Sequence, residues 1–332
     1  MVDLYLSRVD YHQAPALEAF KNSHIFQTLD WLNFLSYTQN AEPVIAVVKQ
    51  GNHELGRFSG LIVEKFGMRI LGSPFPGWTT SYMGFNLPPS VSKVDALHAL
   101  ESFAFHELDC VHIEIMDRNI SLDDFRQAGY QYSISYSFEI DLAKDKEQLF
   151  SKMSSACRRC IRKADKSGVH IEIADDLLFA DDYYVQCEDV FAKQGLVPPY
   201  HKERVKALIE YLLPSGNLLL LRAKDKEKNC IATGIFPAFN NAMYFWGGAS
   251  WRAHQNLRPN ELVQWSAMLY WKSRGITKYD MGGGGDYKRK YGVEEIAIPW
   301  GRKSRYPGLE NLRNLGKNLF SFKQKIAGLG KN

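Results

Sequence analysis

The chain has 332 residues, of which 45% are hydrophobic and 13% aromatic. This composition excludes a disordered chain, and the length allows two domains of ordinary size that each bury a full core. Its 41 Lys and Arg against 37 Asp and Glu leave a net charge of +4, which is too small to indicate nucleic-acid binding by itself. Five cysteines without regular spacing argue against a disulfide framework and favour a reducing compartment.

No segment has the pattern of a membrane span or of a secretory signal. The sequence contains no run of 18 apolar residues, and its first ten residues lack an apolar core. We therefore expect a cytoplasmic protein.

The first half of the chain, residues 1–142, is expected to form one domain. The apolar periodicity and the turn residues predict helices over residues 28–39 and about 94–108. Strands are predicted over 44–49, 56–63, 68–72, 111–116 and 131–142.

The second half, residues 143–301, repeats this order. Its predicted helices cover 149–169, 182–194, 202–213 and 260–274, and its predicted strands cover 218–223, 230–237, 242–247, 277–281 and 295–300. In each half a hairpin sheet leads into a helix that crosses over to a further strand. We therefore predict an α/β (α+β) fold in which each half is a mixed, mainly antiparallel sheet flanked by helices. Asp117 and Asp280 fall at equivalent places, at the end of the strand after the crossover helix.

The predicted helix between the halves is strongly cationic. Arg158 and Arg162 lie one helical turn apart, as do Arg159 and Lys163, so cations face more than one side. Such a helix can hold the phosphates of a nucleotide, a lipid diphosphate or an RNA backbone. It can equally be a solvated linker, because most charge runs simply face water.

The most unusual segment is residues 279–292, YDMGGGGDYKRKYG. Four glycines directly after a predicted strand let the backbone approach a ligand closely and adopt positive φ angles. The segment lacks the Gly-Lys-Ser/Thr ending of an NTPase phosphate loop, and it does not open a helix as a dinucleotide fingerprint does. Because Asp280, Asp286 and Lys288 flank the glycines, we predict that the loop, including Gly283 and Gly284, faces a ligand.

Together these segments resemble the Fem-type aminoacyltransferases and the related acyltransferase branch of the GNAT superfamily. The resemblance rests on three segments. The first is Phe-Gln-Thr followed by Trp31, and the second is the basic helix followed by Gly168 and Val169. The third is the strand that ends in Asp, followed by a glycine cluster and an aromatic-Lys-x-x-aromatic-Gly segment. It covers nearly the whole chain. The resemblance implies tandem GNAT-like domains, which the repeated order of elements suggests independently.

Proteins of this family join an acyl or aminoacyl group to an amine of a cell-envelope precursor or of an amino sugar. The resemblance places the family's aromatic-Lys pair on Tyr287 and Lys288, and it implies that the lysine stabilises the charge that develops on the donor's carbonyl oxygen. An ammonium held by a glycine loop in a partly dry cleft suits that task. The attacking amine must be neutral, so Asp280, Asp117 or a water chain is expected to take its proton. Either aspartate can instead be a helix cap or a strand end.

The sequence departs from the family where coenzyme A would bind. GNAT enzymes typically cradle its pyrophosphate with a glycine-containing loop before the crossover helix. Residues 253–260, AHQNLRPN, contain no glycine, although Arg252, Arg258 and the helix start can still hold a phosphate. The long helical arm that some Fem-type proteins insert for tRNA is also missing. Acyl-CoA and aminoacyl-tRNA both remain candidate donors.

A second candidate surface is the Pro/Gly-rich loop over residues 72–89. Its prolines stiffen it, and Trp78, Tyr82 and Phe85 offer flat faces on which a sugar ring can lie. A packed aromatic loop is the alternative. Cys157 and Cys160 have the spacing of half a zinc site, but the sequence offers no second pair, so we expect no metal.

Residues 302–332 are predicted to form a basic tail. They contain eight basic residues and one acid, which gives +7 against −3 for the rest of the chain. Apolar residues recur every three or four positions from Leu309 to Leu329, as in an amphipathic helix. This helix is expected either to pack on its own domain or to lie on an anionic membrane surface.

These observations predict an N-acyltransferase that acts on an amine of a nucleotide- or lipid-linked sugar or of another sugar- or peptide-linked envelope precursor. The protein would work in the cytoplasm, with a possible peripheral contact to the inner face of the membrane. Two alternatives are a tRNA-dependent aminoacyltransferase for peptidoglycan precursors and a non-catalytic GNAT-like protein that binds glycan or membrane.

Overall fold

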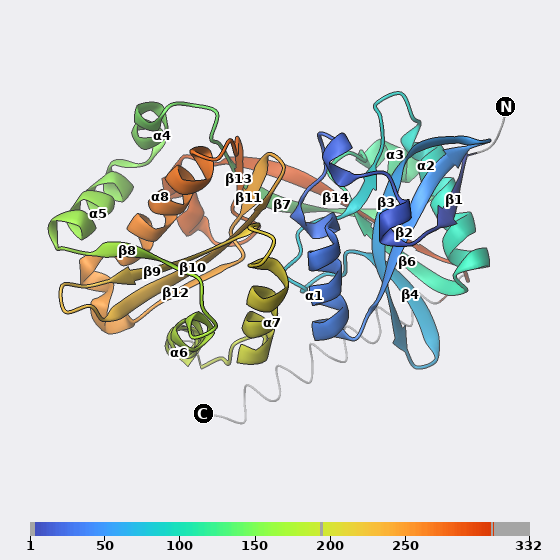
Figure 1. Cartoon of the computed structure of the whole chain (residues 1–332). Coiled ribbons are helices and arrows are strands. Elements are labelled where there is room, and N and C mark those ends of the chain that lie inside the picture. Colours follow the sequence, from blue (N-terminus) through green and yellow to red (C-terminus); the bar gives the residue numbers. More distant parts are fainter. Residues whose placement is uncertain (1–3, 193–194, 307, 309–332) are drawn as a thin grey trace.

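The computed structural model describes residues 4–192, 195–306 and 308. Figure 1 shows two halves, each a sheet with helices packed on it, joined by long strands. The helices are α1 (Leu29–Gln39), α2 (Lys93–Ser102), α3 (Leu122–Gln127), α4 (Lys146–Lys152), α5 (Ser155–Lys166), α6 (Phe179–Ala192), α7 (Lys202–Leu212) and α8 (Pro259–Lys272).

The strands fall into two sets that follow the predicted order. The first set is β1 (Leu4–Arg8), β2 (Glu42–Gln50), β3 (His53–Lys65), β4 (Met68–Ser73), β5 (Gly84–Asn86), β6 (Cys110–Met116) and β7 (Gln131–Asp141). The second set is β8 (His170–Ala174), β9 (Leu218–Lys224), β10 (Cys230–Phe239), β11 (Ala242–Tyr244), β12 (Gly247–Ser250), β13 (Lys278–Asp280) and β14 (Glu294–Ser304).

A single path of hydrogen-bonded strands runs through both halves, in the order β1-β2-β3-β4-β6-β14-β7-β13-β11-β10-β9-β8. On this path β4 pairs with β6, and β11 with β13, in parallel, while the other neighbours are antiparallel. Each parallel pair is connected by a crossover helix, α2 in the first half and α8 in the second. The predicted mixed, mainly antiparallel sheets with flanking helices are therefore confirmed.

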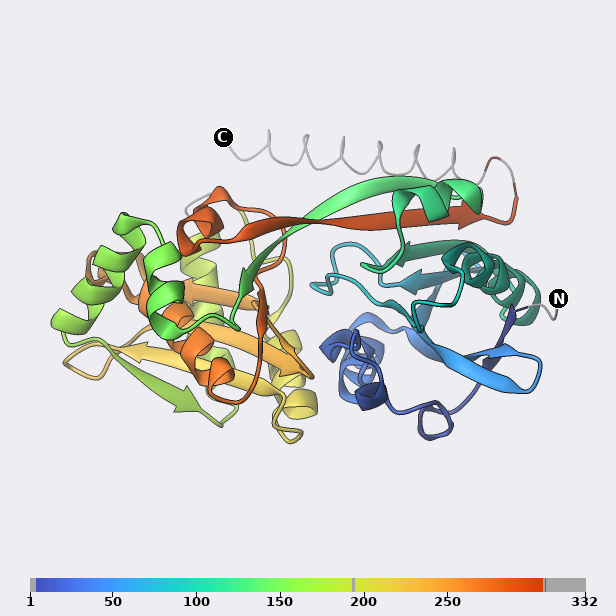
Figure 2. The same cartoon turned by 90° about the horizontal axis from the view of Figure 1, so that it is seen from above.

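Strands β7 and β14 join the two halves. β14 pairs with β7 from Glu294 to Arg302 and with β6 from Trp300 to Ser304, while the end of β7 pairs with β13. Figure 2 shows the two strands as long ribbons that lie side by side and connect the second half with the first. β14, the last strand among the described residues, thus completes the sheet of the first half, and the two halves share one hydrogen-bonded framework.

This extension corrects the predicted start of the tail. Arg302 and Lys303, which were assigned to the tail, are part of β14 because their backbones pair with β6 and β7. Residues 309–332, on which the predicted amphipathic helix falls, lie outside the described residues. Within the described part of the chain, no helix has both the length and the apolar character that crossing a bilayer requires.

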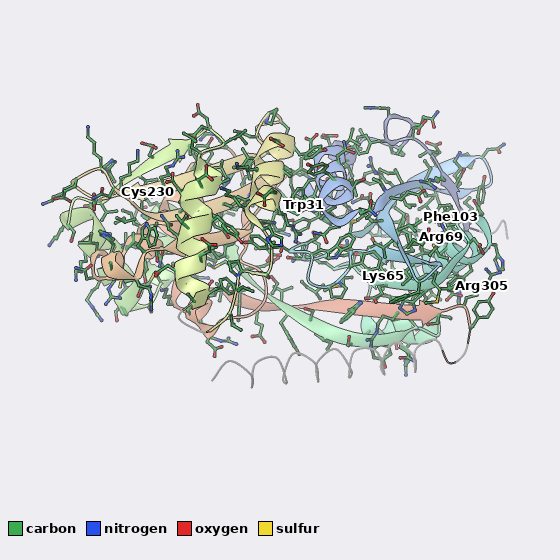
Figure 3. All side chains as sticks on the ribbon, turned by 90° about the horizontal axis from the view of Figure 1, so that it is seen from below. Trp31, Lys65, Arg69, Phe103, Cys230 and Arg305 are labelled. Atoms are coloured by element: carbon green, nitrogen blue, oxygen red, sulfur yellow. The ribbon has the colours of Figure 1, made fainter. Side chains whose placement is uncertain are left out.

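One apolar core belongs to both halves. Trp31 and Phe34 of α1 and Leu208 of α7 are fully buried in the same cluster. Figure 3 places Trp31 where the halves meet, whereas Phe103 lies within the first half and Cys230 within the second. Because separating the halves would expose these side chains to water, this shared cluster stabilises their relative positions.

The predicted helix over 149–169 is in fact two helices. α4 ends at Lys152, and α5 starts afresh at Ser155 because the Ser154 hydroxyl accepts a hydrogen bond from the Cys157 N–H at 3.2 Å. A side-chain oxygen that bonds the third residue of a helix is a typical N-cap. After the break, Arg158 bonds back to the end of α4, as described below.

Candidate active site

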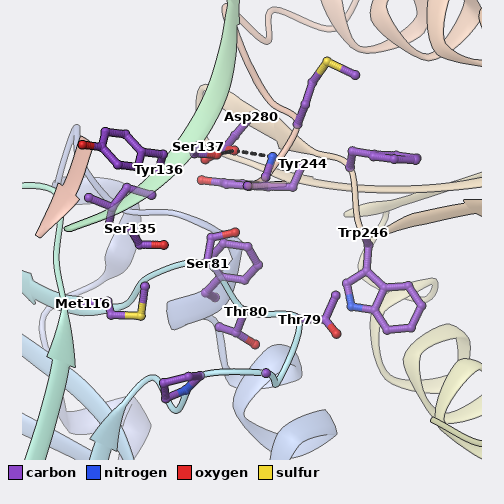
Figure 4. A pocket seen from close by; sticks show the side chains of 18 of the residues that line it. Thr79, Thr80, Ser81, Met116, Ser135, Tyr136, Ser137, Tyr244, Trp246 and Asp280 are labelled. Atoms are coloured by element: carbon purple, nitrogen blue, oxygen red, sulfur yellow. Dashed lines mark hydrogen bonds between the residues drawn. The ribbon is translucent and has the colours of Figure 1, made fainter. Parts of the chain in front are cut away.

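A cavity of about 480 Å³ lies where the two halves meet. We call it the central cavity. Its walls come from the loop after β4 (residues 76–77 and 79–81), the middle of β7 (135–137), the end of β11 (244–246) and the loop after β13 (280–283). Figure 4 shows polar side chains of the first half, such as Thr80 and Ser81, across the cavity from Tyr244 and Asp280 of the second.

Asp280 is the last residue of β13, and its carboxyl group is buried in the wall of this cavity. Its Oδ1 atom accepts hydrogen bonds from the Ser137 hydroxyl and from the Gly282 N–H, the latter at 2.8 Å. Its Oδ2 atom is buried without a hydrogen-bond partner among the described residues. Burial raises the pKa of Asp280 above its ordinary value, and the nearby Glu139 adds to the rise. A carboxylate with one unsatisfied oxygen is suited to accept a proton from a bound amine.

Lys288 lies under the glycine loop, with 6% of its surface exposed. Its Nζ atom donates to the carbonyl oxygens of Met281 at 2.6 Å, Gly282 at 3.2 Å and Gly283 at 2.8 Å. These bonds use all the donors of an ammonium group. Burial lowers the pKa of Lys288 to about 8, and the charge of Asp280 opposes this shift. Lys288 therefore fixes the loop and places a positive charge beside the cavity, but it presents no free N–H to a ligand.

The loop requires glycine for two separate reasons. Gly282, Gly284 and Gly285 have φ angles of 72°, 71° and 80°, which most side chains adopt only at a cost. At Gly283, a Cβ atom would come within 2.5 Å of the Tyr136 carbonyl oxygen. The loop thus packs directly against β7. Gly282 and Gly283 line the central cavity, whereas Gly284 does not.

Two predicted catalytic residues lie outside the central cavity. Tyr287 is 53% exposed and does not line the cavity, although its neighbour Lys288 does. Asp117 is buried, and both its oxygens are occupied: Oδ1 accepts from the Asn119 N–H and Oδ2 from the Phe85 N–H, each at 2.8 Å. Burial raises the pKa of Asp117 to about 6. Its role is to hold the turn into β5, which corrects its assignment as a candidate base in this cavity.

The aromatic rings predicted either to stack on a sugar or to form a packed loop lie outside the central cavity. Trp78 packs against Phe75, with ring centroids 4.8 Å apart, and it does not line the cavity. Tyr82 is 1% exposed, and its hydroxyl is bonded to Tyr244 Oη at 3.1 Å and to Arg118 Nη1 at 2.9 Å. Tyr82 is therefore packed in the interior, as the alternative predicts, whereas Trp78 is only partly buried. Other aromatic residues line the cavity, among them Tyr244 and Trp246, which were not predicted from the sequence. Their position at the end of a predicted strand was the available signal.

The Phe-Gln-Thr and Trp31 segment has a structural link to the cavity. Phe26 lines it, and Trp31 Nε1 donates a hydrogen bond to Thr80 Oγ1 at 3.2 Å. Thr80 belongs to the loop after β4, which forms part of the wall from the first half. This part of α1 therefore positions the wall contributed by the first half.

A second cavity, of about 790 Å³, lies over α5 and the start of α8. We call its cationic lining the α5–α8 surface, which consists of Arg159, Arg162, Lys163, Lys166 and Arg258. No Asp or Glu lines this cavity among the described residues. α8 begins here without a side-chain cap, so its first N–H groups add to the positive potential. The surface is suited to hold phosphate groups.

Arg158 does not belong to this surface, contrary to the prediction. Its Nη1 atom donates to the carbonyl oxygens of Ser151 at 2.6 Å and Met153 at 2.8 Å, at the end of α4. Arg158 therefore holds α4 against α5. Among the described residues, no group of three or more His, Cys, Asp or Glu side chains is placed to hold a metal ion.

The second half of the chain matches a known protein family. Residues 151–290 match the family described as "Acetyltransferase (GNAT) domain". No curated protein matches the chain in sequence. Among solved structures, a FemX crystal structure is 14% identical with a TM-score of 0.71, and the match covers 89% of this chain and 96% of FemX.

Two further structures share the fold. A tandem GNAT protein from the clavulanic acid biosynthesis pathway is 9% identical with a TM-score of 0.52, covering 92% of this chain and 99% of that one. L-PGS from Bacillus licheniformis is 12% identical with a TM-score of 0.51, covering 88% of this chain and 96% of that one. The second half of the chain therefore contains a GNAT acetyltransferase domain, and the chain as a whole adopts the tandem GNAT-like fold.

Proposed function

We propose that the protein transfers an acyl group to a primary amine of a nucleotide- or lipid-linked sugar, or of a related envelope precursor, in the central cavity. The observation that carries this proposal is the Asp280 carboxylate, which lines the cavity with one buried oxygen unsatisfied. The GNAT domain supports the reaction class. The choice of an envelope precursor rests on the resemblance of the sequence segments to the Fem-type aminoacyltransferases.

Asp280 serves as the base in this reaction. A primary amine is mostly an ammonium at neutral pH, so it must lose a proton before it can attack. Asp280 Oδ2 accepts that proton, and the neutral nitrogen then adds to the acyl carbon. The new C–N bond forms, the bond between the acyl carbon and the donor breaks, and the departing group takes up the second proton of the amine. Burial keeps the pKa of Asp280 raised, which brings its basicity closer to that of a useful general base.

Lys288 acts through position and charge. Its ammonium holds the carbonyls of the glycine loop and lies beside the cavity in a largely dry environment. A fixed positive charge there favours the negative charge that develops on the acyl oxygen, even without a direct hydrogen bond. Its three hydrogen bonds also keep the loop against β7, so the cavity keeps its shape.

The α5–α8 surface is proposed to hold the phosphates of the donor. Residues 253–260 contain no glycine, and the turn before α8 is made instead by Arg258, which has a φ angle of 59°. The uncapped start of α8 and the cations of α5 together fit a phosphate-bearing donor. Acyl-CoA and aminoacyl-tRNA both carry such phosphates.

A donor and acceptor screen tests the proposal. Purified protein is incubated with radiolabelled acetyl-CoA, or with charged tRNA, and with a set of nucleotide-linked amino sugars, and label is followed into acid-stable amide products. We expect transfer to an amino sugar from one donor class. Transfer from charged tRNA alone would select the aminoacyltransferase alternative. If no donor gives an amide, although the same preparation binds an amino sugar, the non-catalytic alternative holds. Mass spectrometry of co-purifying small molecules narrows the set to be tested.

A further inference from the structure

A smaller cavity, which the proposed reaction does not use, lies next to the central cavity. Its volume is about 190 Å³, and both halves form its walls. The first half contributes residues 21–24 and 117–119, and the second contributes Asn241, Ala242 and Lys278. Among the described residues, Tyr244 alone lines both cavities. We call this smaller cavity the anion pocket because of the charged residues that line it.

The ionic groups of this pocket favour a negatively charged ligand. Lys21, Arg118 and Lys278 line it, and Asp117 is its one acid among the described residues. The Asp117 oxygens are already bonded to the N–H groups of Phe85 and Asn119. Arg118 is paired with Glu139, which lies outside the lining. Two lysines therefore remain for a ligand, and neither has an ion-pair partner within the described part of the chain.

Neutral donors complete the pocket. Asn22 and Asn241 line it from opposite halves and carry amide N–H groups. Asn119 lines it as well, although its amide donates to Asp117 at 3.2 Å. Ammonium and amide groups around a space with no free carboxylate form the pattern that binds an oxyanion.

The size of the pocket limits the ligand. A volume of 190 Å³ corresponds to about six water molecules at roughly 30 Å³ each. Such a space is sufficient for one phosphoryl group. Two lysines on walls from different halves suit a doubly charged anion better than a singly charged carboxylate. Each lysine can then face a separate oxygen of the ligand.

We propose that this pocket binds a phosphate-type oxyanion that bridges the two halves of the protein. The ligand would contact Lys21 of the first half and Lys278 of the second. It would lie near the hydroxyl pair of Tyr82 and Tyr244, whose second member lines the central cavity. Binding would therefore stabilise the assembled halves around the central cavity.

Calorimetric titration of inorganic phosphate into the full chain, at constant ionic strength, tests this proposal. We expect the double variant Lys21→Gln/Lys278→Gln to bind at this pocket at least tenfold more weakly than the unmodified protein, and Lys278→Arg to retain binding. Both lysines are exposed, so the double variant should keep its melting temperature in the absence of phosphate. Lys163→Gln is the matched control, because it removes a cation from the α5–α8 surface and leaves the pocket unchanged.

Equal phosphate affinity in the double variant and the unmodified protein would overturn the proposal, as would the absence of phosphate binding by the unmodified protein. Glycerol phosphate distinguishes the source of the oxyanion: equal affinity indicates the headgroup of a larger ligand, and binding of inorganic phosphate alone indicates the free ion. None of these titrations involves acyl transfer, so the result is independent of the proposed function.

Discussion

Asp117 and Asp280 occupy equivalent positions in the two halves but have different chemical environments. Backbone N–H groups bond both oxygens of Asp117, whereas Asp280 retains a buried oxygen without a partner among the described residues. A repeated fold therefore supplies the same residue twice, and the local hydrogen bonds decide which copy can react. This difference was not visible in the sequence, because both aspartates simply end a strand.

The first prediction concerns the cost of burying Asp280. Its pKa is raised in the folded protein, so the ionised group destabilises the fold once the pH exceeds its ordinary value. Asp280→Asn keeps an oxygen for the Ser137 and Gly282 donors and removes the charge. We expect the variant to melt at a higher temperature than the unmodified protein at pH 8, by about 1–2 °C for each kcal/mol regained. The difference should shrink as the pH falls toward 4. Scanning calorimetry across this range checks it, and a lower melting temperature at pH 8 would contradict it.

The second prediction concerns Lys288. Lys288→Met removes the positive charge beside the cavity and leaves three loop carbonyls without their donor. We expect turnover to fall at least tenfold. Lys290→Met is the matched control, since Lys290 lies on the same segment and pairs with Glu261 at 2.7 Å, away from the cavity lining. Steady-state kinetics check this prediction. An equal loss of turnover in the two variants would contradict a special role for Lys288.

At the level of elements, the cations of α5 fall into two groups: one bonded within the fold and the others available to a ligand. Arg158 is bonded to the end of α4, while Arg159 and Arg162 line the α5–α8 surface. The sequence predicted the cations but not this division, because the break at Ser154 depends on a local cap rather than on the charge pattern.

The third prediction follows from this division. Arg159→Gln/Arg162→Gln should raise the KM for the phosphate-bearing donor at least tenfold and change kcat little, because phosphate binding contributes equally before and during the chemical step. Arg158→Gln should instead lower the melting temperature and leave that KM nearly unchanged. Kinetics and thermal unfolding of the two variants check both halves of the prediction. An unchanged KM in the double variant would identify α5 as a solvated linker.

The elements that carry the site could be predicted to different extents. Asp280 and the glycine loop were visible in the sequence because a strand, a carboxylate and a glycine cluster are consecutive there. The packing of Tyr82 could not be predicted for another reason: the loop path decides which rings pack inward, and composition does not encode it. The pairing of β14 with β6 joins segments far apart in the chain, and no local pattern indicates such contacts.

At the scale of the whole molecule, two structural features couple the halves. β7 and β14 extend through both, and α1 and α7 bury side chains in one shared cluster. The central cavity and the anion pocket both depend on this arrangement, since each takes its walls from both halves. A change in the relative position of the halves would therefore alter both.

The fourth prediction concerns membrane binding by the tail. Lys303 pairs with Glu101 at 2.7 Å and Arg305 with Asp109 at 3.1 Å, so these cations serve the folded body. Residues 309–332 retain five basic residues and one acid, a net charge of +4. We propose that this segment binds anionic lipid, with each basic residue adding about 1 kcal/mol near the surface. Sedimentation with anionic vesicles should show binding that weakens with salt and disappears when residues after Pro307 are deleted. Equal binding by the full and shortened chains would contradict the prediction.

The central claim is that an amine loses its proton to Asp280 in the central cavity. Its most direct test is the pH dependence of kcat/KM for the unmodified protein and for Asp280→Asn, with the amine acceptor found in the donor and acceptor screen. For the unmodified protein, kcat/KM should rise as Asp280 ionises, with a midpoint above the ordinary range of aspartate. In Asp280→Asn this rise should vanish, and kcat should fall by about 100-fold or more, as expected when a general base is lost. A variant that keeps the turnover and the pH profile of the unmodified protein would contradict the account.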